Sequence, residues 1–145
     1  MLVATHMLAA SAIYKLSSVR QLPGKTAIAA VPAVLALSFA SHFALDAVPH
    51  HEMQMTGNVL VGLAVIVFLC RVAWRDKDLL LLAAAFLGAL PDAMWVLKIS
   101  PAYDAIHSAL HFSGVRVPFY ALIIEFIGMA VLLVINSKRP GSRTA

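Results

Sequence analysis

The sequence contains little charge, because only 12% of its 145 residues are Asp, Glu, Lys or Arg. Soluble domains average about 25% charged residues and roughly 45–50% apolar ones, whereas 61% of this chain is hydrophobic. This composition all but excludes a soluble globular domain and excludes a disordered chain. The length suits one domain, and the sequence therefore predicts a membrane protein.

Cysteine and acidic residues are also scarce. Cys70 is the single cysteine, so an internal disulfide is excluded, and its apolar surroundings indicate a small core or lipid-facing residue. The net charge is +4, but the basic residues fall in three short clusters, which is typical of membrane loops and not of a nucleic-acid-binding patch. No Lys or Arg precedes Lys15, so the charged start of a cleavable signal peptide is lacking and we expect the first apolar segment to be retained.

Long apolar segments predict an all-α polytopic membrane helix bundle. We expect about five membrane segments and a short outer loop helix at 101–113; the membrane segments are 2–14, 26–48, 57–74, 79–97 and 118–135. A spanning helix needs about 20 residues, so 2–14 is short and either enters the bilayer at a tilt or forms a half-buried helix. Residues 1–136 then form a single transmembrane domain, and 137–145 form a polar cytoplasmic tail.

Residues suited to helix ends flank these segments. Thr56 and Asp78 are candidate N-caps for the segments that follow them. Ser100 before Pro101 predicts the start of the loop helix, and Pro118 predicts the start of the last segment.

The placement of lysine and arginine predicts the topology. If 2–14 crosses the membrane, nine of the eleven basic residues share one side, and only Lys98 and Arg116 fall on the other. The positive-inside rule makes the nine-residue side cytoplasmic. We therefore expect the N-terminus outside, the C-terminus in the cytoplasm, and most polar groups at the outer side. That side holds five of the seven acids and all six histidines: His6, His42, His50, His51, His107 and His111.

The spacing of these polar residues points to a metal site. His42 and Asp46 are four residues apart and share a helix face, as do His107 and His111. Two histidines at this spacing can bind one metal ion from a single helix. Asp46 and Asp92 would complete a mixed nitrogen and oxygen site, which suits zinc and also manganese or iron.

Structural roles are alternatives for the same residues. His42 with Asp46 could be a hydrogen-bonded pair that holds two helices together, and Asp92 could satisfy backbone groups freed at Pro91. His51 fits an interfacial anchor. Glu125 fits a structural partner of a histidine as well as a functional role, and His50 is open in the same way.

The polar motifs, in their order along the chain, resemble a known group of proteins. The motifs are Thr5-His6, Ser41-His42 with Asp46, Pro49-His50, Pro91-Asp92 with Trp95, and His107 with His111. From Thr5 to about Glu125 the chain resembles the small bacterial membrane-bound metal-dependent hydrolases of the LexA-regulated inner-membrane type. Unlike in that group, the Ser-His-x-x-x-Asp stretch precedes the Pro-Asp element here, and Asp92 is not followed by a second Asp-His. A weaker, local resemblance links the His42 stretch to zinc-dependent phospholipase C.

The resemblance implies a metal-dependent hydrolase in the bacterial inner membrane. It would act on a lipid-linked or amphiphilic ester or phosphoester at the outer face, with Glu125 or His50 moving the proton. One or two divalent ions, zinc first, would be held by six residues: His6, His42, Asp46, Asp92, His107 and His111. Its partners would be the bilayer and a lipid-like substrate, with no nucleic acid, and a homo-oligomer is left open.

Two non-hydrolytic functions remain as alternatives. Histidine and carboxylate side chains inside membranes also handle metal ions or protons, either in a single protein or in a small subunit of a membrane complex. Haem ligation by two histidines is the other alternative.

Overall fold

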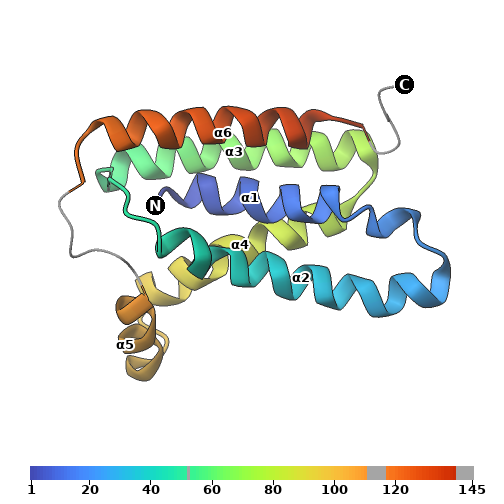
Figure 1. The fold of residues 1–145 in the computed structure, drawn as a ribbon, viewed down its shortest axis with the longest axis horizontal. Coiled ribbons are helices and arrows are strands. Elements are labelled where there is room, and N and C mark those ends of the chain that lie inside the picture. Colours follow the sequence, from blue (N-terminus) through green and yellow to red (C-terminus); the bar gives the residue numbers. More distant parts are fainter. Residues whose placement is uncertain (52, 111–116, 140–145) are drawn as a thin grey trace.

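The computed structural model of this protein describes residues 1–51, 53–110 and 117–139, and these ranges form a bundle of helices without strands (Figure 1). The predicted all-helical bundle is therefore confirmed. Its elements are α1 (Val3–Leu16), the 3-10 turn η1 (Val19–Gln21), α2 (Gly24–Asp46), α3 (Met55–Asp76), α4 (Leu79–Val96), α5 (Pro101–Leu110) and α6 (Tyr120–Ser137). The expected end of the loop helix, at 111–113, lies outside the described residues.

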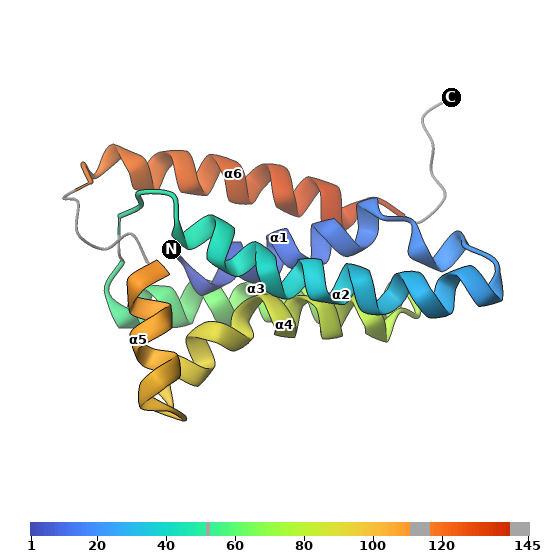
Figure 2. The same ribbon diagram turned by 60° about the horizontal axis from the view of Figure 1, so that its bottom comes forward.

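Four helices are long and apolar enough to cross a membrane, namely α2, α3, α4 and α6. Each has 18 to 23 residues and a mean hydropathy of 1.9 to 2.0 over its most apolar stretch, and they lie lengthwise beside one another (Figures 1 and 2). Large apolar side chains point outward along them, such as Leu63 and Val67 on α3 and Ile124 and Ile127 on α6. A surface of this kind suits contact with lipid tails, so the fold is that of a membrane protein.

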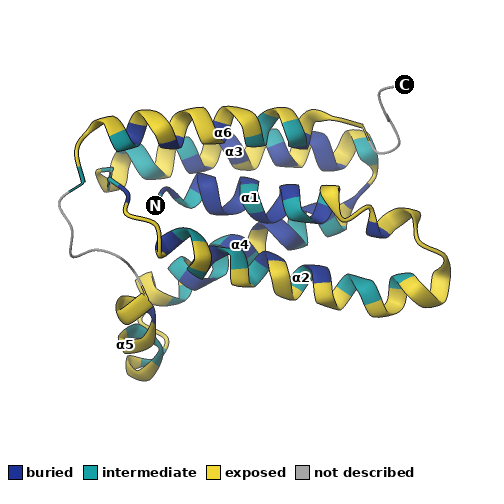
Figure 3. Cartoon of the chain, viewed as in Figure 1, coloured by how far each residue is buried: buried dark blue, intermediate teal, exposed yellow. Residues whose placement is uncertain are grey.

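The short first segment forms the centre of the bundle. Nine of the 14 residues of α1 are buried, and the helix contacts α2, α3, α4 and α6 (Figure 3). Neighbouring helices therefore surround α1 where lipid would surround an outer helix. Neither expectation for 2–14 included this burial by other helices, which explains why a helix too short to span a bilayer alone is stable here.

Small residues let α1 and α4 approach closely. A Cβ atom on Gly88 of α4 would lie 2.5 Å from Cβ of Ala10 and 2.6 Å from the backbone oxygen of His6. Only glycine fits at such a contact, because any side chain would push the helices apart. Gly88 thus fixes the position of α4 against the central helix.

The helix ends agree with the sequence only in part. Tyr103 N donates to Oγ of Ser100 at 3.4 Å, as expected for a cap, and Asp78 precedes α4 without capping it. The expectation for Thr56 is wrong, because α3 begins one residue earlier, at Met55. The last helix begins at Tyr120, two residues after the proline expected to start it.

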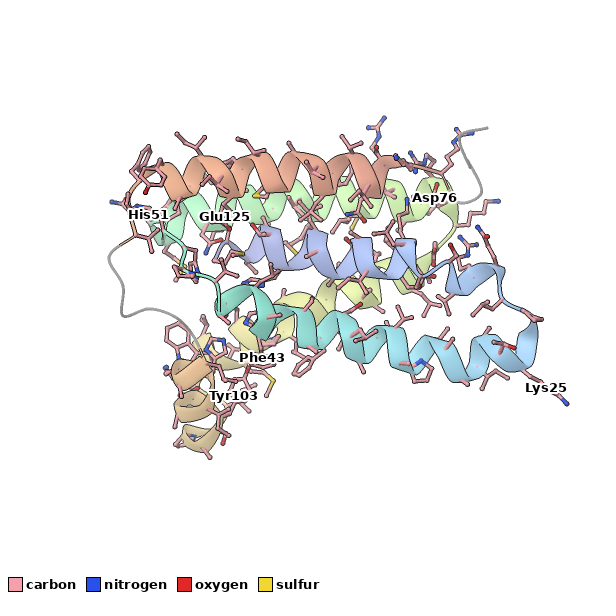
Figure 4. The ribbon with its side chains drawn as sticks, in the orientation of Figure 1. Lys25, Phe43, His51, Asp76, Tyr103 and Glu125 are labelled. Carbon is pink, nitrogen blue, oxygen red and sulfur yellow. The ribbon has the colours of Figure 1, made fainter. Side chains whose placement is uncertain are left out.

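The two ends of the bundle carry different chemistry. At one end, Lys15 pairs with Asp76 at 3.1 Å and Tyr14 donates to Asp78 at 2.9 Å. Lys25 and Asp76 mark this end in Figure 4. The opposite end holds the N-terminal ends of α1 and α6, the C-terminal ends of α2 and α4, and the whole of α5. The histidines and membrane-depth acids of the described chain belong to these segments and to the connection between α2 and α3 at the same end, so they gather at one end as the sequence predicts.

Candidate metal centre

Three helices bring four predicted ligands together. His42 and Asp46 lie one turn apart near the finish of α2, Asp92 follows Pro91 in α4, and His107 is on α5. One ligand atom from each of the four lies within 4.8 Å of all the others. Nε2 of His42 is 2.9 Å from Oδ2 of Asp46, 3.2 Å from Nε2 of His107 and 3.6 Å from Oδ1 of Asp92.

These spacings fit a tetrahedral metal site. Ligands about 2.0–2.1 Å from a zinc ion lie roughly 3.3 Å from one another at the corners of a tetrahedron. Nε2 of His107 is 3.8 Å from Asp46 and 3.6 Å from Asp92, so five of the six separations lie between 2.9 and 3.8 Å. A metal ion at the centre would contact all four atoms, whereas a proton could bridge one pair.

The backbone of α4 orients His42. Its Nδ1 lies 2.9 Å from the carbonyl oxygen of Gly88, and a carbonyl can only accept, so Nδ1 carries the hydrogen. In the neutral ring, Nε2 then directs a lone pair at Asp46 and Asp92. This lone pair is available to a metal ion, and a hydrogen bond at the outer ring nitrogen is the usual support of a histidine metal ligand.

Helix α5 brings His107 to the site. His107 is the one fully buried residue of this mostly exposed helix, and its ring stacks on that of Trp95 with centroids 5.7 Å apart. One turn earlier, the hydroxyl of Tyr103 donates to the carbonyl oxygen of Pro91 at 3.0 Å. Burial raises the pKa of Tyr103, and the negative charge of Asp92 adds to the shift, so the hydroxyl keeps the proton that it donates. The rings of Phe43 and Tyr103, labelled in Figure 4, both lie near that of His107, with centroids 6.3 and 5.8 Å from it.

His6 is a fifth member of the cluster. It is fully buried on α1, with its ring centroid 4.0 Å from that of His42. Its Nε2 lies 3.1 Å from Oδ1 of Asp46 and 4.0 Å from Oδ2 of Asp92. The amino group of Met1 is 3.6 Å from the same Asp46 oxygen. Each carboxylate therefore turns one oxygen to His42 and the other to His6.

An apolar pocket of about 550 Å³ adjoins the cluster. Asp92 and His107 line it, and the side chain of Asp92 is 25% exposed while those of the other ligands are nearly inaccessible. Its further walls include Val3, Val59 and Trp95. The buried site is thus accessible from the pocket through Asp92.

Glu125 has other partners in the structure. Its Oε1 accepts hydrogen bonds from the backbone N–H of Leu2 at 2.8 Å and from the hydroxyl of Thr5 at 2.7 Å. The carboxylate therefore ties the start of α1, and with it His6, to α6 (Figure 4). A role of Glu125 in proton transfer remains a prediction.

The remaining histidines are not among the grouped ligands. Nδ1 of His50 lies 2.8 Å from the carbonyl oxygen of Val48, and Nδ1 of His51 lies 3.3 Å from that of Val117. The catalytic role of His50 also remains a prediction. His111, predicted as a ligand, lies outside the described residues.

Two residues that position the ligands had no such role predicted from the sequence. Gly88 supplies the carbonyl that orients His42, and Tyr103 fastens the helix that carries His107. Signals existed for both: a glycine lies four residues before Asp92, and Tyr103 shares a helix face with His107. Neither signal by itself indicates a contact with another helix.

No family model, curated protein or solved structure matches this chain. The resemblance to membrane-bound hydrolases therefore remains a prediction, and the candidate metal centre rests on its own geometry.

Proposed function

We propose that this protein is a membrane-embedded, metal-dependent hydrolase that acts on an amphiphilic ester or phosphoester. The observation that carries the proposal is the position of the four-residue cluster at the wall of an apolar pocket, where Asp92 and His107 belong to both. Buried charge at membrane depth is costly and indicates function. A hydrogen-bonded His42–Asp46 pair that only held two helices together would not need access from a pocket.

The ligand set agrees with a hydrolytic metal ion. Two imidazoles and two carboxylates suit zinc first, with manganese or iron as alternatives. A bound ion that takes a substrate or water oxygen as a fifth ligand would supply a Lewis acid, which polarises a substrate oxygen and acidifies a water molecule. The chain's own residues fix the geometry: Gly88 and Tyr103 hold the helices that carry His42 and His107, and Asp92 faces the space that a substrate would enter.

The pocket favours an amphiphile as substrate. Most of its lining side chains are apolar, including Val3, Val59 and Val96, so it suits a hydrocarbon chain. Trp95 also lines it, and the ammonium of Lys98 lies 4.5 Å from the centre of the Trp95 ring. This ammonium, which also lies 3.5 Å from Oδ2 of Asp104, is a cation at the edge of the pocket that suits an anionic head group.

The distribution of charge supports a location and an orientation. We propose that the protein lies in a bacterial inner membrane with the basic end of the bundle in the cytoplasm. The metal centre then faces the outer leaflet, from which a lipid head group would enter.

Metal content is the first test. Protein purified in detergent should carry zinc, manganese or iron in stoichiometric amount, and His42→Ala and Asp92→Ala should lose it. His51→Ala is the matched control, because His51 contacts the carbonyl of Val117 and not the cluster. A metal-free wild type, with variants that fold and behave like it, contradicts the proposal.

Activity is the second test, with release of head group or phosphate measured on a panel of lipids. Val59→Trp would fill the pocket from α3, and it should retain the metal but lose turnover of long-chain substrates. Leu63→Trp, one turn further on the same helix, points outward and serves as the control. Stoichiometric metal without turnover of any ester or phosphoester would favour the alternative of a metal-handling protein.

A further inference from the structure

Each of the two carboxylates of the cluster directs one oxygen toward His42 and the other toward His6. Oδ2 of Asp46 and Oδ1 of Asp92 lie 2.9 and 3.6 Å from Nε2 of His42. The other oxygens, Oδ1 of Asp46 and Oδ2 of Asp92, lie 3.1 and 4.0 Å from Nε2 of His6. Both carboxylates thus stand between two separate imidazoles.

His6 itself lacks the partners that a purely structural histidine would have. Its side chain is fully buried, and its Nδ1 has no hydrogen-bond partner in the part of the chain that the structure describes. Nε2 lies near two carboxylate oxygens and within reach of no carbonyl or hydroxyl among those residues. A cation bound at Nε2 would give this buried nitrogen and the two carboxylate oxygens a shared partner.

We propose that the site is binuclear, with a second divalent ion held by His6, Asp46 and Asp92. The inference rests on the metal centre that carries the proposed function. The first ion would have His42, His107 and one oxygen from each aspartate. The second would have His6 and the two remaining oxygens, so that both carboxylates bridge the pair.

Charge and geometry agree with this arrangement. Ions in two-metal hydrolytic sites lie about 3.5–4 Å apart, and carboxylates that bridge such a pair use one oxygen for each ion. The ring centroids of His6 and His42 are 4.0 Å apart. This spacing suits two histidines that bind neighbouring ions.

The second ion would also have an open coordination position, which a four-ligand tetrahedral site lacks. Four protein ligands fill a tetrahedral site, as in structural zinc centres, whereas catalytic sites keep three protein ligands and one open position. The ion at His6 would have three. Val3 on the same helix and Asp92 both line the apolar pocket, so the open position would lie on the side from which the substrate comes.

The test uses the full chain in detergent, stripped of metal and titrated with Mn²⁺ alone. Wild type should bind two ions, and paramagnetic resonance should show the exchange-coupled signal of a bridged pair. His6→Gln should bind one ion and show the signal of isolated Mn²⁺. The control His51→Gln should bind two, because His51 lies outside the cluster.

Three results would overturn the binuclear site. They are one ion per wild-type chain, an uncoupled signal with two ions, or a His6→Gln variant that binds as many ions as wild type. If His6→Gln does not fold, the stoichiometry and coupling in wild type decide alone. An active protein with one ion would remove the second position and leave the proposed function intact, whereas a protein that binds no ion would remove both.

Discussion

His42 donates its Nδ1 hydrogen to the carbonyl oxygen of Gly88, 2.9 Å away, at the point where α4 packs against the central helix. The glycine therefore has two roles. Its carbonyl orients a candidate metal ligand, and its missing side chain lets α4 approach α1 within a distance that no Cβ would permit. The metal site and the packing of the bundle depend on the same residue.

Replacing Gly88 by alanine should lower both the stability of the bundle and the affinity for metal. The added methyl group would lie 2.5 Å from Ala10 Cβ, and overpacking of this kind costs about 1–3 kcal/mol of folding free energy. Displacement of the carbonyl should lower metal affinity about 10–100-fold, as loss of a supporting hydrogen bond does at other sites. Thermal unfolding and metal titration measure the two effects.

Gly128→Ala is the matched control for this prediction. Gly128 lies in α6 with open space where a Cβ would be, so alanine there should be neutral, or stabilise the helix by up to about 1 kcal/mol. Equal losses in both variants would show that the close approach at Gly88 is not the cause.

Tyr103→Phe should loosen α5 without removing a metal ligand. The substitution keeps the ring beside His107 but removes the hydroxyl that donates to Pro91 at 3.0 Å. We expect a loss of about 1 kcal/mol of stability and a several-fold weaker binding of metal, measured by titration. Tyr120→Phe, at an exposed position on α6, should change neither, and unchanged affinity in Tyr103→Phe would exclude this positioning role.

Two substitutions of Glu125 distinguish a structural role of this residue from a catalytic one. In Glu125→Gln the amide oxygen can still accept from Leu2 and Thr5, so stability and metal content should stay close to those of wild type. In Glu125→Ala both hydrogen bonds are lost and two buried donors are left, which should lower the free energy of unfolding by about 2–4 kcal/mol. A Glu125→Gln variant that keeps its metal but loses turnover would establish the proton-transfer role predicted from the sequence.

Removal of metal should destabilise the end of the bundle that holds the cluster. Without a cation, the carboxylates of Asp46 and Asp92 face imidazole lone pairs in a buried site. A ligand present at 100 times its dissociation constant stabilises a fold by about 2.7 kcal/mol, so chelation should lower Tm and added Zn²⁺ should restore it. In Asp46→Asn, with one ligand charge removed, the Tm should respond far less to either treatment.

The sequence alone determined the fold class and the grouping of the polar residues. Runs such as 79–97 and 118–135 are too apolar for any setting but a membrane or the interior of a large protein, and a helix satisfies its own backbone hydrogen bonds there. The spacing of His42 and Asp46 placed them on one helix face, and the distribution of lysine and arginine sorted the acids and histidines to one end. These properties depend on neighbours within a helix or on simple counts along the chain.

Only the tertiary structure decided which polar residues meet. Sequence spacing cannot show that the short segment 2–14 is the centre of the bundle, because its burial comes from four other helices. It cannot separate His6, which reaches the two aspartates, from His50, which contacts a nearby carbonyl. It left Glu125 between a structural and a catalytic role, and only the structure shows that this carboxylate binds the start of α1. The cluster forms where α1, α2, α4 and α5 converge, and the contacts that set this convergence, such as Gly88 against Ala10, join residues far apart in the chain.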